Sequence, residues 1–241
     1  MANFSKNHAH RAGKAVKQFL CAAALAVSGV AQAGVLDFEG PVDSPFVFAG
    51  DHIQVGKYWI ESYGGSLSSD LVGAFVDGSD PGSCFGVSCP VNNATQYYSG
   101  LDDGYSYFGF NNDDTFRLGS LRASFIGTGQ ASFPAVAGLL VLQGFDALGH
   151  AVGGAHQLGL SGPVGGQFNF GTFDLSSITD TFTYVRVLGY ACDANGNCNR
   201  NSNLSNFAID DIVTVPEPGS LALFGLGVAG LGLASRRRRV R

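Results

Sequence analysis

The middle of the chain is a series of short runs in which apolar and polar residues alternate, separated by Gly, Asn, Asp and Ser. This two-residue period, bounded by turn-forming residues, is typical of half-buried antiparallel strands. Long amphipathic helical stretches are absent from the sequence. The pattern predicts an all-β fold, an antiparallel β-sandwich or jelly roll. We expect strands at Val35–Glu39, His52–Glu61, Leu71–Val76, Tyr105–Phe110, Thr115–Ile126, Val136–Phe145, Gln167–Leu175, Thr181–Ala191 and Asn206–Val215.

The alternation changes phase at Gly119-Ser120 and again at Gly171-Thr172, as it does where a β-bulge inserts one extra residue. Leu139–His156 has the pattern of a hairpin that turns at Asp146-Ala147-Leu148-Gly149. Two longer segments lack a strand pattern and are expected to be loops, Asp77–Gly104 and Cys192–Asn203.

The first 33 residues have the order of a secretory signal peptide. A positive region precedes the apolar run Phe19–Val30, and Ala31-Gln32-Ala33 then places small residues at the two positions that a signal peptidase reads. We expect cleavage after Ala33; the alternative is a buried N-terminal helix. The positive residues are Lys6, Arg11, Lys14 and Lys17.

The composition changes abruptly at the other end, from Val215 onward. Pro216-Glu217-Pro218 ends the last strand, because proline cannot donate to a ladder. Leu221–Ala234 is wholly apolar or glycine, and the cluster Arg236, Arg237, Arg238 and Arg239 follows it. As a helix the apolar run reaches about 21 Å, less than a bilayer core of about 30 Å. We therefore expect a short C-terminal transmembrane helix, with the arginines in the cytoplasm, which suits a stop signal that is later cut; the alternative is a permanent anchor.

These boundaries divide the chain into a signal peptide (1–33), an extracellular β-sandwich domain (34–214) and a sorting tail (215–241). Between the two ends remain five basic residues against 18 of the 19 acidic ones, which favours neutral partners or divalent cations and excludes nucleic acid. The five are Lys57, Arg117, Arg122, Arg186 and Arg200.

Four cysteines remain once the signal peptide is removed, an even number that favours disulfides in an exported chain. Their spacing predicts two local bonds, Cys84–Cys89 and Cys192–Cys198. Cross-pairing of Cys84 with Cys192 and Cys89 with Cys198 is the alternative.

Catalytic motifs are missing from the sequence. His52, His150 and His156 form no HExxH pattern, and no Gly-x-Ser-x-Gly elbow is present. The adjacent acids Asp102-Asp103, Asp113-Asp114 and Asp210-Asp211 point to opposite faces of a strand, so adjacency alone makes no acid/base pair. We therefore expect no enzyme, although a glycosidase dyad built from distant strands stays open.

The aromatic residues of one strand are the best candidates for a ligand platform: Trp59 with Tyr58, and beside them Tyr63. The alternative, which the sequence favours, is that they belong to the core.

The tail resembles the PEP-CTERM sorting domain of Gram-negative bacteria in its Val-Pro-Glu-Pro-Gly-Ser motif, its Leu/Gly-rich span and its terminal arginines. The resemblance implies recognition by an exosortase, with cleavage near Pro216, Glu217 and Pro218. It also implies association with exopolysaccharide or a biofilm matrix.

Leu36-Asp37-Phe38-Glu39 and Phe207–Ile212 resemble the two terminal strands of carbohydrate-binding-module jelly rolls. That resemblance implies that the strands lie side by side and share a structural calcium. It names Glu39 and Asp210 as ligands, with Asp211 or Asp37 less certain. Solvent-facing acids are the alternative.

Together these observations predict a secreted, non-catalytic surface or matrix protein that binds glycan. The expected route runs through signal peptidase, a precursor held transiently in the inner membrane, exosortase, and finally the cell surface or extracellular matrix. An extracellular polysaccharide hydrolase and a self-associating structural matrix protein are the two alternatives.

Overall fold

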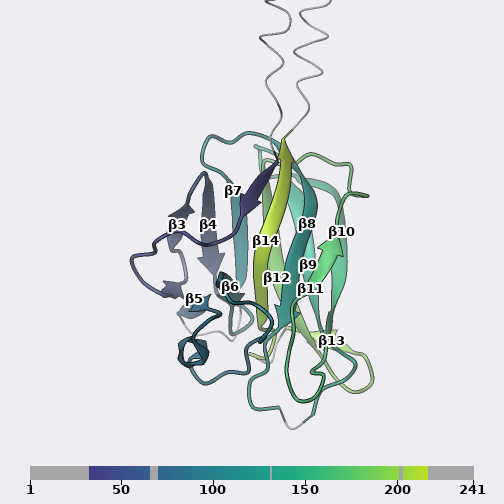
Figure 1. Cartoon of the computed structure of the whole chain (residues 1–241). Coiled ribbons are helices and arrows are strands. Elements are labelled where there is room, and N and C mark those ends of the chain that lie inside the picture. Colours follow the sequence, from purple (N-terminus) through teal and green to yellow (C-terminus); the bar gives the residue numbers. More distant parts are fainter. Residues whose placement is uncertain (1–32, 66–69, 131, 201–202, 217–241) are drawn as a thin grey trace, which may run out of the picture. The chain divides into compact units, whose positions relative to one another are not determined.

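Two antiparallel sheets of seven strands each form the architecture of this protein, as seen in a computed structural model (Figure 1). The structure describes residues 33–65, 70–130, 132–200 and 203–216. The fold is all-β, as the alternating pattern predicts. The expected signal helix and transmembrane helix lie outside the described residues. No helix within the described ranges is long and apolar enough to cross a membrane.

The first sheet has the strand order β11-β8-β14-β6-β5-β2, and β1 pairs with the other part of β14. Its long central strand β14 therefore joins segments from the beginning, middle and end of the domain. The strands are β1 (Gly34–Leu36), β2 (Phe46–Phe48), β5 (Leu71–Asp77), β6 (Gln96–Gly100), β8 (Phe116–Phe125), β11 (Gly171–Asp174) and β14 (Phe207–Pro216).

The second sheet has the order β10-β9-β12-β7-β4-β3, and β13 pairs with the end of β12. Every neighbouring pair in it is antiparallel. The strands are β3 (His52–Val55), β4 (Tyr58–Tyr63), β7 (Tyr105–Phe110), β9 (Val136–Phe145), β10 (Ala151–Ser161), β12 (Tyr184–Cys192) and β13 (Cys198–Asn199). A short 3-10 helix, η1 (Pro81–Cys84), lies in the first cysteine loop.

Aromatic and branched side chains from both sheets fill the space between them. Phe116 of β8 packs on Phe108 and Phe110 of β7, with ring centroids 6.1 and 5.3 Å apart. The hydroxyl groups of Tyr58 (β4) and Thr214 (β14) share a hydrogen bond of 2.7 Å across the core. Since all of these groups are buried, they stabilise the sandwich and leave only the outer faces for ligands.

Several predicted strands differ from those in the structure. His52–Glu61 is not one strand but the hairpin of β3 and β4, which turns at Gly56 with a positive φ of 59°. Strand β6 lies inside the segment expected to be a loop, and β2 was not predicted because its three residues give too short a pattern.

The two predicted bulges had different outcomes. The register of β14 against β8 shifts by one residue opposite Gly119, as a bulge there requires. At Gly171-Thr172 the prediction was wrong, because β11 begins only at Gly171 and pairs with β8 without a shift.

The two ends of the domain lie beside each other on paired strands. Gly34, the residue after the expected signal cleavage site, is opposite Thr214, and Pro216 is opposite Phe116 of β8. The sorting tail therefore begins directly at the end of a central strand.

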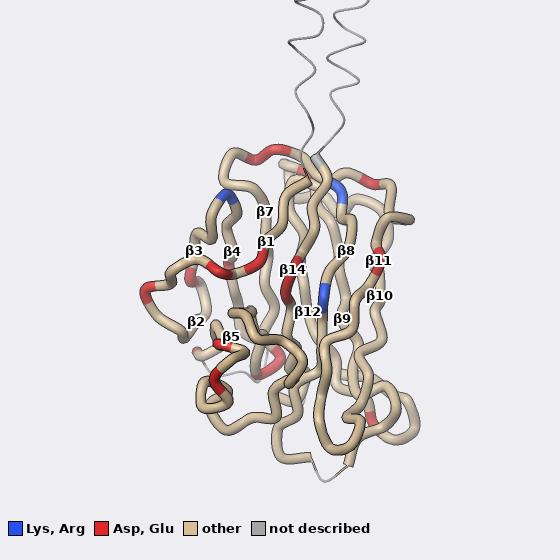
Figure 2. The backbone as a smooth tube through the Cα atoms, in the orientation of Figure 1, with Lys and Arg blue, Asp and Glu red and all other residues tan. Residues whose placement is uncertain are grey.

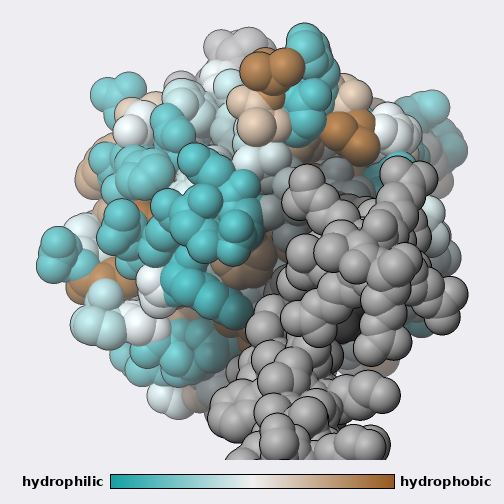
Figure 3. All heavy atoms as spheres, turned by 90° about the horizontal axis from the view of Figure 1, so that it is seen from above, coloured by the Kyte–Doolittle hydropathy of each residue, from teal (hydrophilic) through white to brown (hydrophobic). Residues whose placement is uncertain are grey.

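The surface of the domain is polar and acidic. Acidic positions are spread along the backbone in Figure 2, whereas basic positions are few. Seen from above, the visible described surface is largely hydrophilic with separate hydrophobic residues (Figure 3).

Candidate functional site

The outer face of the second sheet carries three cross-strand rows of mostly large side chains. Directly opposed residues of antiparallel strands point to the same side of a sheet, so each row shares one face. In the order β4, β7, β12, β9 the rows are Trp59, Gly109, Tyr184 and Phe145; Glu61, Tyr107, Arg186 and Gln143; and Tyr63, Tyr105, Leu188 and Val141. Six of these residues are partly exposed aromatics, which we call the aromatic face: Trp59, Tyr63, Tyr105, Tyr107, Phe145 and Tyr184.

Tyr107 lies at the centre of the aromatic face. Its ring makes edge-to-face contacts with Tyr63, Tyr105, Phe145 and Tyr184, at centroid distances of 5.9, 5.8, 6.1 and 5.7 Å. Contacts of this geometry contribute about 0.5–1.5 kcal/mol each beyond the burial of their area. The rings are therefore held in place by one another before any ligand arrives.

A pocket of about 360 Å³ opens among these rings. Its aromatic walls come from β4, β7 and β12, and two carboxylates, Glu61 and Asp113, also line it. An apolar pocket with a few polar groups is the usual form of a small-molecule or sugar site. The lining residues are Trp59, Glu61, Tyr63, Tyr107, Asp113, Ala147, Thr183 and Tyr184.

The backbone of β7 fixes the position of Trp59. The indole Nε1 donates a hydrogen bond of 3.1 Å to the carbonyl oxygen of Phe110. Gly109 lies under the ring: a Cβ atom there would come within 3.0 Å of Trp59 Cζ2. The ring of His52, in the other strand of the hairpin (β3), stacks on the indole of Trp59 at a centroid distance of 5.6 Å. Glycine at this position allows the indole to lie flat against the strand.

Glu61, the acidic residue of the second row, interacts with two neighbouring side chains. Tyr63 donates a hydrogen bond to the carboxylate of Glu61, which raises the pKa of Tyr63 to about 12. His52 Nδ1 lies 3.8 Å from the same carboxylate. Glu61 therefore lines the pocket with a carboxylate that is held in place by its neighbours.

Of the two predicted platform residues, Trp59 lies on the aromatic face but Tyr58 does not. Tyr58 is 2% exposed and points into the core, so its assignment as a ligand residue is wrong. Adjacent strand residues point to opposite sides, so the two could never have shared a face. The sequence did show which side chains face outward. Glu61 is charged and lies two positions after Trp59, so both side chains point to the same, outer side of β4.

The three predicted calcium ligands each have protein partners. Asp210 is 1% exposed, and its carboxylate accepts hydrogen bonds from Asn93 Nδ2 at 2.7 Å and the Asp211 amide at 2.8 Å. Burial raises its pKa to about 6. Asp211 pairs with Arg122 at 3.3 Å. Glu39 accepts a hydrogen bond of 3.1 Å from the amide of Gln96.

No three or more His, Cys, Asp or Glu side chains of the described part gather into a group that could hold a metal ion. Calcium binding by Glu39, Asp210 and Asp211 therefore stays a prediction. The solvent-facing alternative does not apply to Asp210, which is buried.

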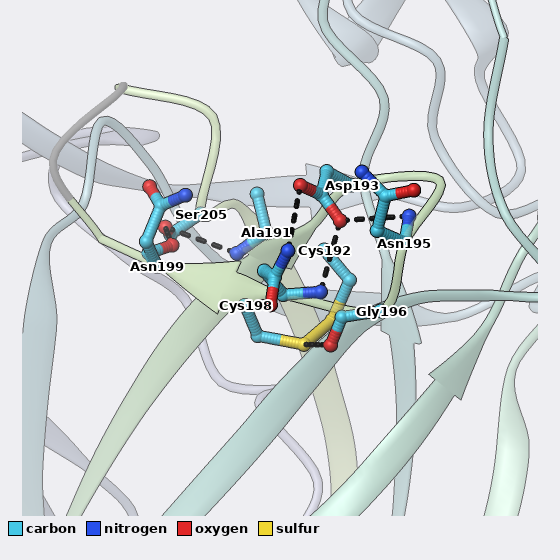
Figure 4. The surroundings of a disulfide bond; sticks show 9 residues. Ala191, Cys192, Asp193, Asn195, Gly196, Cys198, Asn199 and Ser205 are labelled. Atoms are coloured by element: carbon cyan, nitrogen blue, oxygen red, sulfur yellow. Dashed lines mark hydrogen bonds between the residues drawn. A yellow bond between two sulfur atoms is a disulfide. The ribbon is translucent and has the colours of Figure 1, made fainter.

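Both disulfides form within their own loops, Cys84 with Cys89 and Cys192 with Cys198. In the second loop the carboxylate of Asp193 accepts hydrogen bonds from the amides of Asn195 and Asn197, both at 2.9 Å (Figure 4). The Cys192–Cys198 disulfide joins β13 to β12 at one end of the second sheet. Its role in the structure is to fold the loop beside the aromatic face.

The predicted sorting residues are mostly outside the described part. Pro216 ends β14, whereas Glu217, Pro218 and the arginines Arg236, Arg237, Arg238 and Arg239 lie outside the described residues.

Residues 214–239 match the model of the PEP-CTERM protein-sorting motif. The chain therefore carries this motif, which implies processing by an exosortase and export to the cell surface. No curated protein matches the sequence.

Similar folds occur among solved structures. A DUF4465 family protein from Bacteroides caccae shares 13% identity at a TM-score of 0.52, over 77% of this chain and 100% of that one. The C-terminal family 22 carbohydrate-binding module of Clostridium thermocellum Xyn10B shares 14% identity at a TM-score of 0.29, over 73% of this chain and 97% of that one. The enzymatically active domain of bacteriophage CBA120 tailspike protein 4 shares 12% identity at a TM-score of 0.33, over 67% of this chain but 19% of that one. At such low identity the first match shows the fold alone.

Proposed function

We propose that this exported surface protein is non-catalytic and binds a polysaccharide chain through the aromatic face. The observation that carries the proposal is the gathering of six partly exposed aromatic rings on one sheet, around a pocket that also presents carboxylates. Sugar rings offer apolar C–H faces that pack on aromatic rings, and hydroxyl groups that bond to carboxylates and amides. The face supplies both kinds of contact.

The fixed positions of the rings support this proposal. Ordering side chains on binding costs about 0.5–1.5 kcal/mol each for flexible residues. Tyr107 and its neighbours already contact one another, and Trp59 is bonded to the backbone. Little of that cost remains when a ligand binds.

Sorting through the tail gives this binding a place of action. We infer that the chain is cut near Pro216 by an exosortase after the signal peptide has been removed, and then joins an extracellular polysaccharide matrix. Because Pro216 ends β14, a cut near this residue would release the whole β-sandwich, including the aromatic face, as one piece.

Trp59 is the one tryptophan of the chain, so its fluorescence reports on the proposed site. Titration with a panel of soluble polysaccharides should change its emission where a sugar packs on the indole. Tyr184→Ala keeps the reporter and should weaken binding about tenfold, because it removes one wall of the pocket. Phe48→Ala removes a 48% exposed ring on the first sheet and should leave affinity unchanged.

Binding that survives Tyr184→Ala and a second variant, Trp59→Ala measured by calorimetry, would refute this site. Binding lost equally in Phe48→Ala would point to general destabilisation instead.

An extracellular hydrolase is the second candidate, because Glu61 and Asp113 line the same pocket. Two carboxylates on either side of a sugar are the requirement for glycoside hydrolysis. New reducing ends released from the same panel, and lost in Glu61→Gln, would favour the hydrolase. Binding without product favours the proposed function.

A further inference from the structure

Two of the five basic residues of the central region lie at the aromatic face. Arg186 of β12 stands in the second row, between Tyr107 and Gln143. Arg200 directly follows β13, which pairs with the end of the same strand β12. In a region with 18 acidic residues, this placement brings two of the five positive charges to the aromatic face.

Each guanidinium lies over a ring of the aromatic face. The Cζ atom of Arg186 is 5.6 Å from the centre of Phe145, and that of Arg200 is 5.7 Å from the centre of Tyr105. Tyr107 contacts both rings, at 6.1 and 5.8 Å. Burial lowers the pKa of Arg200, whereas Tyr190 and Asp103 raise it and the charge of Arg186 lowers it again to a smaller extent, so the two cations are within electrostatic reach of each other.

Neither arginine forms an ion pair among the described residues, although the charge of Asp103 acts on Arg200. The ion pairs there involve Arg122, His52 and His150 instead. The Nε atoms of Arg186 and Arg200 are buried and have no hydrogen-bond partner in the described part of the chain.

The carboxylates of Asp103 and Glu61 already accept hydrogen bonds within the protein. Arg200 donates to the backbone carbonyl of Asp103. The carboxylate of Asp103 accepts hydrogen bonds from the amides of Asn203 and Ser205, at 2.9 and 3.1 Å. Glu61 is bonded to Tyr63.

A buried donor without a partner is destabilising, and two neighbouring like charges add to that cost. An anion bound by the terminal nitrogens of the guanidinium groups would offset the repulsion, and the planar fork of arginine matches a carboxylate in two parallel bonds. We propose, building on the proposed function, that the ligand is an acidic polysaccharide. Arg186 and Arg200 bind a uronate carboxylate while the adjoining sugar ring packs on Tyr107.

The negative charge of the rest of the domain does not prevent this. At physiological salt, charges more than about 8 Å apart are largely screened. The local pair therefore decides the contact, and the acidic surface elsewhere keeps the polyanion from binding at other places.

The test compares two ligands that differ only in charge, polygalacturonate and its carboxyl-reduced form, on the full-length chain in mild detergent at physiological salt. Arg186→Gln should weaken binding of polygalacturonate about tenfold, or about 1.4 kcal/mol. Arg117→Gln removes the same charge from the first sheet and should change nothing. Trp59→Ala should weaken binding of polygalacturonate as well.

Equal affinity for both polymers, or unchanged affinity in Arg186→Gln, would overturn the acidic ligand and leave glycan binding by the face intact. Loss of affinity in Arg117→Gln that equals the loss in Arg186→Gln would also overturn it, because the effect would then be one of net charge. If neither polymer nor any other polysaccharide binds, the proposed function itself fails.

Discussion

The contact between Gly109 and Trp59 allows a sharp test of the aromatic face. Gly109→Ala adds one methyl group at 3.0 Å from Cζ2 and 3.1 Å from Cε2 of the indole. Carbon atoms pack best about 3.5–4.0 Å apart, so the ring must move outward by roughly 0.5–1 Å. The same Cβ lies 2.9 Å from the carbonyl oxygen of Thr183, which limits movement of the strand itself.

The movement has a calculable effect on binding. The indole hydrogen bond to Phe110, now 3.1 Å, would lengthen toward the limit at which such bonds lose their strength. A hydrogen bond of this kind contributes about 1 kcal/mol net. That amount is lost from the stability of the fold. Because the displaced indole no longer matches the sugar surface, we also expect Gly109→Ala to weaken polysaccharide binding by roughly threefold to tenfold, and the emission of Trp59 to shift toward that of an exposed indole.

The assay is a titration of Trp59 fluorescence in parallel with thermal unfolding. Gly154→Ala is the matched control, since its Cβ in β10 of the same sheet meets nothing within 4 Å. The melting temperature should fall by about 2–4 °C in Gly109→Ala, because about 1 kcal/mol is lost, and change little in Gly154→Ala. Full affinity in Gly109→Ala, with a displaced indole reported by fluorescence, would refute the claim that the position of Trp59 determines binding.

The remaining predictions concern stability. Because burial raises the pKa of Asp210 to about 6, the folded chain keeps a proton there that the unfolded chain releases near pH 4. Stability present below about pH 4 should be lost as the pH rises through about 6, by up to about 3 kcal/mol, and Asp210→Asn should flatten this fall in melting temperature. Gly144→Ala would place a Cβ atom 1.9 Å from Phe182 Cδ1 and should lower the free energy of unfolding by about 1–3 kcal/mol in urea titrations, whereas an unchanged midpoint would contradict the packing between the sheets. Replacing Cys192 and Cys198 together by Ser should cost about 2 kcal/mol, and no loss would mean that the loop is closed by its hydrogen bonds alone. Calcium should raise the melting temperature at pH 7 and chelator should lower it, if Glu39 and Asp210 bind the ion; no shift in either direction would remove that hypothesis.

Strand positions were predictable where the alternating pattern was long. Tyr105–Phe110 and Val136–Phe145 coincide with β7 and β9. Errors fell where the pattern was short or continuous. The run His52–Glu61 contains a single glycine and no proline, so its turn at Gly56 was not recognised in the pattern. Strand β6 was missed because it lies between a disulfide loop and a turn, in a segment rich in Ser, Asn and Gly.

Determinants that act over a few residues could be identified in the sequence alone. The Val-Pro-Glu-Pro-Gly-Ser motif, the apolar run and the terminal arginines identify the C-terminal sorting motif, and cysteines five or six positions apart close local loops whatever the rest of the fold does. The alternation of apolar residues likewise determines that strands form, because each strand must bury one face.

Which strands become neighbours was decided only by the tertiary structure. The aromatic face needs β4, β7, β12 and β9 side by side, and these strands are separated by long stretches of chain. Pairing between distant strands depends on how the whole core packs, and no local pattern encodes it. The same holds for Arg186 and Arg200, which lie over rings from other strands, Phe145 of β9 and Tyr105 of β7. The sequence determined that this protein is exported as a β-sandwich, and the sheet order placed its rings and its two arginines on one face.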